Sequence, residues 1–220
     1  MQRKIGSLTG VTAHSVGTDA YGDRLQALAS SSSGVEIALG NWRDGQFLRG
    51  RGFDLVLADY LLGSTELHWA NGADELMDRL LSVLRPGGYL LIVGLEPYEL
   101  VLDRSRAMDR LVLDIEAIGD SAATLAGEAT YRELPEEWVR QRIARHAELR
   151  VVTSRNFAMR ITAKSLAGQI SFAREMAAKI GDAGLRDAYA LRTRALERDL
   201  GGFGTHTRAR NYAMVVQREV

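Results

Sequence analysis

Five residues have side chains that are suited to binding a nucleoside, and each lies where a strand is expected to end. Asp19 supplies a carboxylate, which can accept hydrogen bonds from both hydroxyls of a ribose. Asn41 supplies an amide that can read the edge of a base, and Trp42 supplies a ring that can stack on it. Asp59 and Tyr60 are expected to end a third strand and to face the middle of the cleft. Because open α/β sheets bind ligands outside the carboxyl ends of their strands, these residues predict one binding site.

Three side chains are candidates for proton transfer. His68 follows the strand that ends at Asp59, and His206 lies in the glycine-rich stretch "GGFGTHTRARNY". Either imidazole can act as a general base on a hydroxyl or amine if the fold holds it within about 3 Å of the acceptor. The carboxylate of Asp59 is the third candidate. His14 and His146 complete the four histidines, whose spacing matches no metal-ligand pattern, so no metal site is expected.

Two continuous apolar runs, 53–60 and 89–94, predict the strands that position these residues. Runs of this kind are typical of parallel strands covered on both faces. Between them, apolar residues recur every three or four positions over 76–84, which predicts an amphipathic helix. Asn71 is the expected cap of that helix, and the turn "RPGG" at 85–88 is expected to end it. The stretch therefore predicts a βαβ unit with a right-handed crossover.

The rest of the chain continues the alternation of strands and helices. Further strands are expected at 11–20, 35–39, 149–152 and 212–217, and further helices at 24–29, 108–115, 135–147 and twice within 164–199. This order predicts an α/β three-layer sandwich. A chain of 220 residues with no internal repeat is expected to form a single domain, 1–220, with a helical insertion at about 163–200.

Composition narrows the class of protein. Lys and Arg total 28, as do Asp and Glu, so the net charge of zero gives no indication of a nucleic-acid partner. The absence of cysteine excludes disulfides and thiolate sites. No apolar run approaches the ~20 residues of a membrane span, and the start "MQRKIGSLTG" has no apolar core of a signal peptide. A cytoplasmic protein without a membrane partner is expected.

The order "GTDA … VEIALGNWRD … FDLVLADY … LLSVLRPGGYLLIVG" resembles class I S-adenosylmethionine-dependent methyltransferases from their second strand onward. The resemblance implies a Rossmann-like, mostly parallel sheet with an antiparallel last strand and helices inserted near the substrate. It assigns the cofactor ribose to Asp19, the adenine to Asn41 and Trp42, and the methionine part of S-adenosylmethionine to Asp59 and Tyr60. Substrate pocket residues are expected at 98 and at 131–132, which are Tyr98, Tyr131 and Arg132.

One family signature, a glycine-rich loop after the first strand, has no clear match. In "IGSLTG" Leu8 stands where the middle glycine belongs, and eight residues between Gly10 and Asp19 are too few for a helix and a strand. Reading "VGTDAYGDR" as the loop instead makes 35–39 the second strand, which then ends at Asn41 without the acid. Three explanations remain open: a native chain that starts earlier, a first strand replaced by "RKIGSLTGVTAH", or a shortened relative whose sheet a partner chain completes.

The sequence therefore predicts a methyltransferase that transfers a methyl group from S-adenosylmethionine to a small molecule. The alternative is a non-catalytic, methyltransferase-like partner or regulatory protein. A nicotinamide dehydrogenase is a third interpretation, and it too requires a glycine fingerprint. The expected partners are a small-molecule substrate and, for the oligomeric state, a second copy of the chain. A nucleic-acid substrate is not expected, because "DYLL" stands where an N/D-P-P-Y loop would follow the 53–60 strand.

Overall fold

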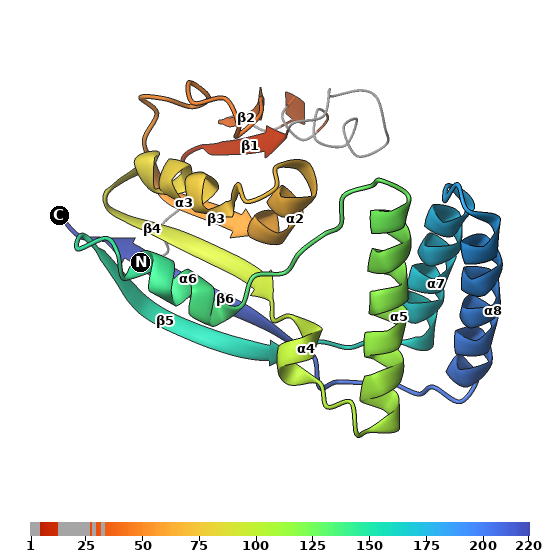
Figure 1. Ribbon diagram of the computed structural model, residues 1–220. Helices are drawn as coiled ribbons and strands as arrows, with labels where there is room; N and C mark the ends of the chain where they lie inside the picture. The colour runs from red at the N-terminus through yellow and green to blue at the C-terminus, as the bar shows by residue number, and fades with distance from the viewer. Residues whose placement is uncertain (1–4, 13–26, 28–29, 32–33) are drawn as a thin grey trace. The chain divides into compact units, whose positions relative to one another are not determined.

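The computed structural model describes residues 5–12, 27, 30–31 and 34–220 (Figure 1). The chain divides into two compact units, Met1–Arg51 and Gly52–Val220. Four of the features expected from the sequence lie wholly or mostly outside the described residues: Asp19, His14, the helix at 24–29 and most of the strand at 11–20.

The described part of the first unit contains a parallel pair of strands. Strand β1 (Leu8–Thr12) pairs with β2 (Val35–Leu39), with Leu8 opposite Val35 and Thr12 opposite Leu39. The strand β2 matches the prediction, whereas β1 begins three residues before the strand expected at 11–20. A tight turn then follows β2, in which the backbone N–H of Asp44 donates to the carbonyl oxygen of Asn41 at 2.9 Å.

The second unit is built on a four-stranded sheet in the order β3-β4-β6-β5. Its strands are β3 (Phe53–Asp59), β4 (Leu84–Leu95), β5 (Leu149–Ala158) and β6 (Arg210–Arg218). β3 is parallel to β4, and β6 is antiparallel to both β4 and β5. Three strands therefore run in one direction and the last strand in the other. This mostly parallel α/β sheet with an antiparallel last strand confirms the predicted fold class.

Helices α3 (Ala73–Ser82) and α6 (Glu136–Ile143) lie against the sheet (Figure 1). The apolar residues of α3, among them Leu76, Met77 and Leu80, are buried, as their spacing predicts. Pro135 is the N-cap of α6, where its fixed φ suits the entry to a helix. Helix α2 (Leu61–His68), directly after β3, was not expected from the sequence.

Three of the remaining helices pack on one another in a separate layer: α5 (Ala107–Leu125), α7 (Ala163–Ala178) and α8 (Ala183–Leu200). The short helix α4 (Tyr98–Val101) follows the end of β4. Figure 1 shows α5, α7 and α8 side by side, and their common core includes Ile115, Ile170 and Leu196. Thr162 and Ser165 form a capping box at the start of α7. Helices α7 and α8 occupy the stretch where two helices were expected.

Two local predictions need correction. Helix α3 begins after Gly72 rather than at an Asn71 cap, because Asn71 has a φ of 60° and lies outside the helix. The "RPGG" turn lies within the bounds of β4, where it shifts the pairing register between Phe53 and Leu55 of β3. Gly87 has a φ of 78°, which glycine adopts at little cost. Among the described residues, no helix combines the length and apolar character needed to span a membrane.

Candidate functional site

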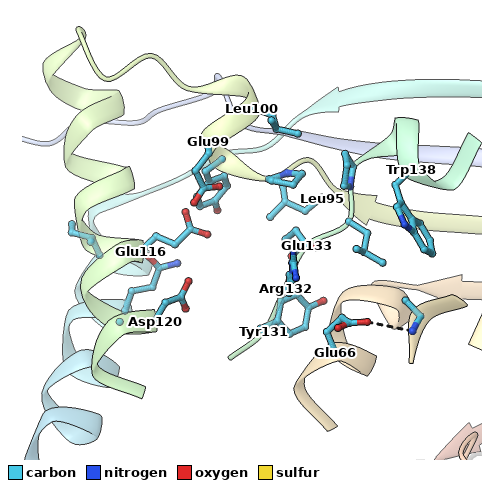
Figure 2. Close-up of a pocket in the computed structure, with 18 of the residues that line it drawn as sticks. Glu66, Leu95, Glu99, Leu100, Glu116, Asp120, Tyr131, Arg132, Glu133 and Trp138 are labelled. Carbon is cyan, nitrogen blue, oxygen red and sulfur yellow. Dashed lines mark hydrogen bonds between the residues drawn. The ribbon is translucent and has the colours of Figure 1, made fainter. Parts of the chain in front are cut away.

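A cavity of about 860 Å³ opens at the carboxyl end of β4, within the second unit. Its walls come from α4 and α5, from α7, from residues 131–135 (loop 131–135) and from α2 with the start of α3 (Figure 2). Small-molecule sites are typically clefts of roughly 300–1,000 Å³. The cavity therefore has the place and the size of a small-molecule site in an α/β fold.

The sheet holds loop 131–135 through Gly94 and Tyr212. A Cβ atom at position 94 would lie 2.4 Å from the ring of Tyr212, so only glycine lets this ring cross the strand. The Tyr212 hydroxyl donates a hydrogen bond of 2.9 Å to the carbonyl oxygen of Leu134, which lines the cavity. A buried contact between β4 and β6 thus fixes one wall of the cavity.

A second contact joins loop 131–135 to the end of β3. The hydroxyl of Tyr131 donates a hydrogen bond of 3.0 Å to the carbonyl oxygen of Tyr60. Gly63 in α2 permits this approach, because a Cβ atom there would lie 2.8 Å from the Tyr131 ring and 2.9 Å from Oε2 of Glu133. Tyr131 and Glu133 therefore pack directly on α2.

The cavity is acidic. Among the described residues that line it, six are acids and one is basic: Glu66, Asp74, Glu99, Glu116, Asp120 and Glu133, with Arg132. Two of the six have structural roles. Glu66 accepts backbone hydrogen bonds from Asn71 at 2.9 Å and Ala73 at 3.3 Å, at the start of α3 (Figure 2). Asp74 forms an ion pair of 2.8 Å with Arg142. The others leave an excess of negative charge facing the cavity.

Burial and mutual repulsion disfavour ionisation of these acids. Burial, followed by the charges of Glu99, Asp120 and Glu133, raises the pKa of Glu116 to about 8. Burial raises the pKa of Glu133 to about 7, against the opposing effect of a hydrogen bond from the backbone N–H of Leu95. Burial and the charge of Glu99 also raise the pKa of Asp120. Glu116 and Glu133 can therefore exchange protons near neutral pH.

Two tyrosines also contribute to the polar lining. Burial raises the pKa of Tyr98 and that of Tyr131 to about 12, and nearby carboxylates add to the effect. Both phenols stay protonated at neutral pH and act as hydrogen-bond donors rather than bases. Tyr98, Tyr131 and Arg132, which were expected to line the substrate pocket, all line this cavity.

Asp59 and Tyr60 lie where the sequence predicts, at the carboxyl end of β3. Asp59 is the last residue of the strand and is exposed, and Tyr60 follows with a left-handed φ of 49°. Neither residue is part of the cavity lining. The Tyr60 carbonyl, however, accepts the hydrogen bond from Tyr131, and Tyr131 lines the cavity. An exposed carboxylate at this edge is suited to a cationic part of a ligand.

Asn41 and Trp42 belong to the first unit. The side-chain oxygen of Asn41 accepts a hydrogen bond of 2.9 Å from the backbone N–H of Arg43, so it stabilises the turn after β2. Trp42 packs edge to face on Phe47, with ring centroids 5.4 Å apart. Both side chains have local packing roles, and the assignment of these residues and Asp19 to a cofactor stays a prediction.

The two candidate histidines lie outside the cavity lining. His68 is exposed in the last turn of α2. His206 is buried, with Nε2 at 2.6 Å from Oδ1 of Asp109, and Nδ1 accepts a backbone hydrogen bond of 3.3 Å from Arg208. Both ring nitrogens of His206 are therefore engaged, which is typical of a structural histidine.

The acids of α5 were not identified from the sequence. Glu116 and Asp120 are one helical turn apart, and Ile115 and Gly119 precede them on the side of α5 that faces the cavity. Like charges at this spacing destabilise an isolated helix. Two such acids, each directly after a residue of the inward-facing side, were therefore the sequence signal that could have indicated a site. The described residues contain no group of three or more His, Asp or Glu that could hold a metal ion.

The sequence matches no protein-family model and no curated protein. Its fold resembles a cyclopropane-fatty-acyl-phospholipid synthase-like protein from Lactobacillus casei ATCC 334, with a TM-score of 0.63 and 15% identity over 96% of this chain and 75% of that one. A candidate methyltransferase from Bacillus halodurans C-125 gives a TM-score of 0.53 and 12% identity over 98% and 94%. Mycolic acid cyclopropane synthase CmaA1, complexed with SAH and CTAB, gives 0.53 and 12% over 96% and 70%.

The fold is Rossmann-like and resembles that of solved proteins of the methyltransferase type. Identities of this size show the fold alone. The methyltransferase fold agrees with the sheet of the second unit, in which the last strand is inserted antiparallel between β4 and β5.

Proposed function

We propose that this protein is an S-adenosylmethionine-dependent methyltransferase that acts on a small molecule. The observation that carries the proposal is the cavity at the carboxyl end of β4, in a fold whose solved relatives include a protein complexed with SAH. Fold alone does not assign a function, but a site of this size at the ligand-binding edge of the sheet supports one.

The residues at the end of β3 fit part of the cofactor. S-adenosylmethionine, when bound, supplies a methyl group on a positively charged sulfur, and its α-amino group carries a second positive charge. Asp59 presents an exposed carboxylate at this strand end, which suits the positive charges. The hydrogen bond from Tyr131 to the Tyr60 carbonyl joins the wall of the cavity to the end of β3, which supports a cofactor bound beside the cavity. Alignment of two bound reactants is the main contribution that the chain has to make.

Calorimetric titration of the full chain with S-adenosylmethionine and S-adenosylhomocysteine tests the proposal. We expect micromolar binding that Asp59→Asn weakens by about 1–3 kcal/mol, as for a lost charge-assisted hydrogen bond. Asp54→Asn is the matched control, because Asp54 is also exposed but lies at the opposite end of β3. Asp19→Ala tests the ribose assignment from the sequence. No heat and no thermal shift at millimolar ligand would rule out cofactor-dependent catalysis by this chain.

A non-catalytic methyltransferase-like partner is the second proposal, and the edge strand β3 favours it. β3 pairs with β4 alone in the described sheet, and Leu55 and Leu57 are 58% and 57% exposed. Exposed apolar side chains on an edge strand are typical of surfaces that pair with another chain. Light scattering over a range of concentrations, with Leu57→Lys as the variant, separates an associating protein from a monomer.

A further inference from the structure

The cavity combines a surplus of carboxylates with apolar and aromatic walls. Glu99 comes from α4, and Glu116 and Asp120 from α5, and Figure 2 shows the three side chains gathered on one side of the cavity. Tyr98 and Phe172 are among the aromatic residues of the lining. Carboxylates favour a cation, and aromatic faces favour an organic cation over a strongly hydrated one.

Two buried oxygen atoms in this wall lack a donor. Among the described residues, Oε2 of Glu116 and Oε1 of Gln169 are buried without a hydrogen-bond partner. Both residues line the cavity, one from α5 and the other from α7. Buried acceptors without partners cost free energy in the empty protein, and a ligand that brings N–H donors recovers it. A protonated amine carries donors and positive charge on the same atom.

We propose that the cavity binds a small organic amine in its ammonium form, and that this nitrogen is the methyl acceptor. The second part rests on the proposed methyltransferase function. In the reaction, a lining carboxylate takes one proton from the ammonium ion. The nitrogen lone pair then forms the N–C bond while the C–S bond breaks, its electron pair staying on sulfur. Charge balances, because the neutralised carboxylate and the neutral thioether accompany a methylated ammonium ion.

Glu116 is the carboxylate best placed for this role. Its free oxygen is buried in the wall, and its pKa of about 8 lies near that of a base that works at neutral pH. The titratable groups around it are Tyr98 and Glu99 from α4, Asp120 from α5, and Tyr131, Arg132 and Glu133 from loop 131–135, while α7 contributes the uncharged Gln169. Because acids outnumber the single base Arg132 around it, Glu116 is held protonated in the free protein. A bound cation lowers the pKa of Glu116 and favours its ionisation, so binding releases protons.

The test uses ligands of matched shape and different charge with the full-length protein. The first set is tryptamine, tryptophol and indole-3-acetate, and the second is n-octylamine, n-octanol and octanoate. We expect at least one amine to bind about 10-fold more tightly than its alcohol, as for a charge-assisted hydrogen bond in a partly buried site, and its carboxylate to bind worst. Calorimetry in buffers of different ionisation enthalpy should show proton release near pH 7.

Glu116→Gln should abolish the preference for the amine, whereas Glu175→Gln, an exposed acid of α7 outside the cavity lining, should not. Equal binding of amine and alcohol, preference for the carboxylate, or no amine binding up to roughly 10 mM overturns the proposal. Competition between the amine and S-adenosylhomocysteine also overturns it, because the cavity would then be the cofactor pocket. A parallel titration with S-adenosylhomocysteine alone tests the proposed function separately, since amine selectivity does not require cofactor binding.

Discussion

Nε2 of His206 lies 2.6 Å from Oδ1 of Asp109, and the two side chains are 4% and 2% exposed. The backbone N–H of Arg208 donates to Nδ1 of this histidine, so Nε2 carries the proton and donates to Asp109. Burial by itself would raise the pKa of Asp109, but hydrogen bonds from the Asp103 backbone and His206 and the charge of Arg208 outweigh it and lower the pKa. The pair joins α5 to the segment before β6.

Removing one partner of this pair should destabilise the protein. His206→Gln leaves a buried carboxylate with one hydrogen bond fewer, so we expect a loss of about 2–4 kcal/mol in the free energy of unfolding. Urea denaturation at pH 7 measures the difference. His68→Gln is the control, because His68 is exposed and should change the free energy by less than about 0.5 kcal/mol. Equal effects of the two substitutions would contradict a structural role for His206.

The raised pKa of Glu116 makes its contribution to stability depend on pH. Its folded-state pKa of about 8 lies above the ordinary value of 4.5, so the folded protein binds the proton more tightly than the unfolded chain. Stability is therefore highest below pH 4.5 as far as this group is concerned, and falls as pH rises from 4.5 to 8. Glu116→Gln should remove this fall and raise the melting temperature at pH 8 by about 2–4 °C for each kcal/mol regained. Thermal unfolding between pH 5 and 8, with Glu175→Gln as control, checks it.

Gly94 should tolerate no side chain. Alanine at this position would place its Cβ 2.4 Å from the Tyr212 ring, and the ring is buried, so it must move and lose its bond to the Leu134 carbonyl. We expect Gly94→Ala to cost about 2–3 kcal/mol and to weaken ligand binding in the cavity, because Leu134 lines it. The control is Gly168→Ala in the interior of α7. A Cβ atom added there would meet nothing within 4 Å beyond the adjoining residues and backbone of its own helix, and alanine should stabilise by about 0.5–1 kcal/mol.

Local patterns predict the elements of this fold better than they predict its cavity. Strands β3 and β4 are recognisable from the continuous apolar runs 53–60 and 89–94, and α3 because its apolar residues follow the helical period. The expected cover on both faces is wrong for β3, where Leu55 and Leu57 are exposed. Helix α2, "LLGSTELH", has no such period and was missed. The bond between Asp109 and His206 joins residues 97 apart in sequence, which no local pattern specifies.

The acids of the cavity were beyond sequence reasoning for a related reason. Whether Glu116 is solvated or buried depends on loop 131–135 and α7 packing around α5. Asp59 and Tyr60, in contrast, were placed correctly at a strand end because the strand itself was recognisable. Positions at strand ends follow from local sequence, whereas the environment of a helix residue follows from its tertiary contacts.

Tyr131 and Tyr98 offer a matched pair for testing the link between the cavity and the end of β3. Both phenols line the cavity, and burial raises the pKa of each to about 12. The Tyr131 hydroxyl donates to the Tyr60 carbonyl at 3.0 Å, whereas the Tyr98 hydroxyl donates to Sδ of Met159 at 3.8 Å. Tyr131→Phe should therefore cost about 0.5–1.5 kcal/mol of stability, and Tyr98→Phe much less, because sulfur is a weak acceptor.

The same pair tests the cofactor assignment at Tyr60. We expect the methionine part of S-adenosylmethionine to lie against the end of β3. Tyr131→Phe removes the hydrogen bond that holds the Tyr60 carbonyl, so Tyr60 is positioned less firmly. Binding of S-adenosylhomocysteine should then weaken about threefold to tenfold, as for the loss of one neutral hydrogen bond. Tyr98→Phe should leave that affinity unchanged, since α4 does not contact β3 through this hydroxyl. Titration of both variants at one pH, with unfolding curves to confirm that each is folded, measures the two effects independently. A loss of affinity in Tyr98→Phe but not in Tyr131→Phe would contradict a cofactor site at the end of β3 and indicate one beside α4.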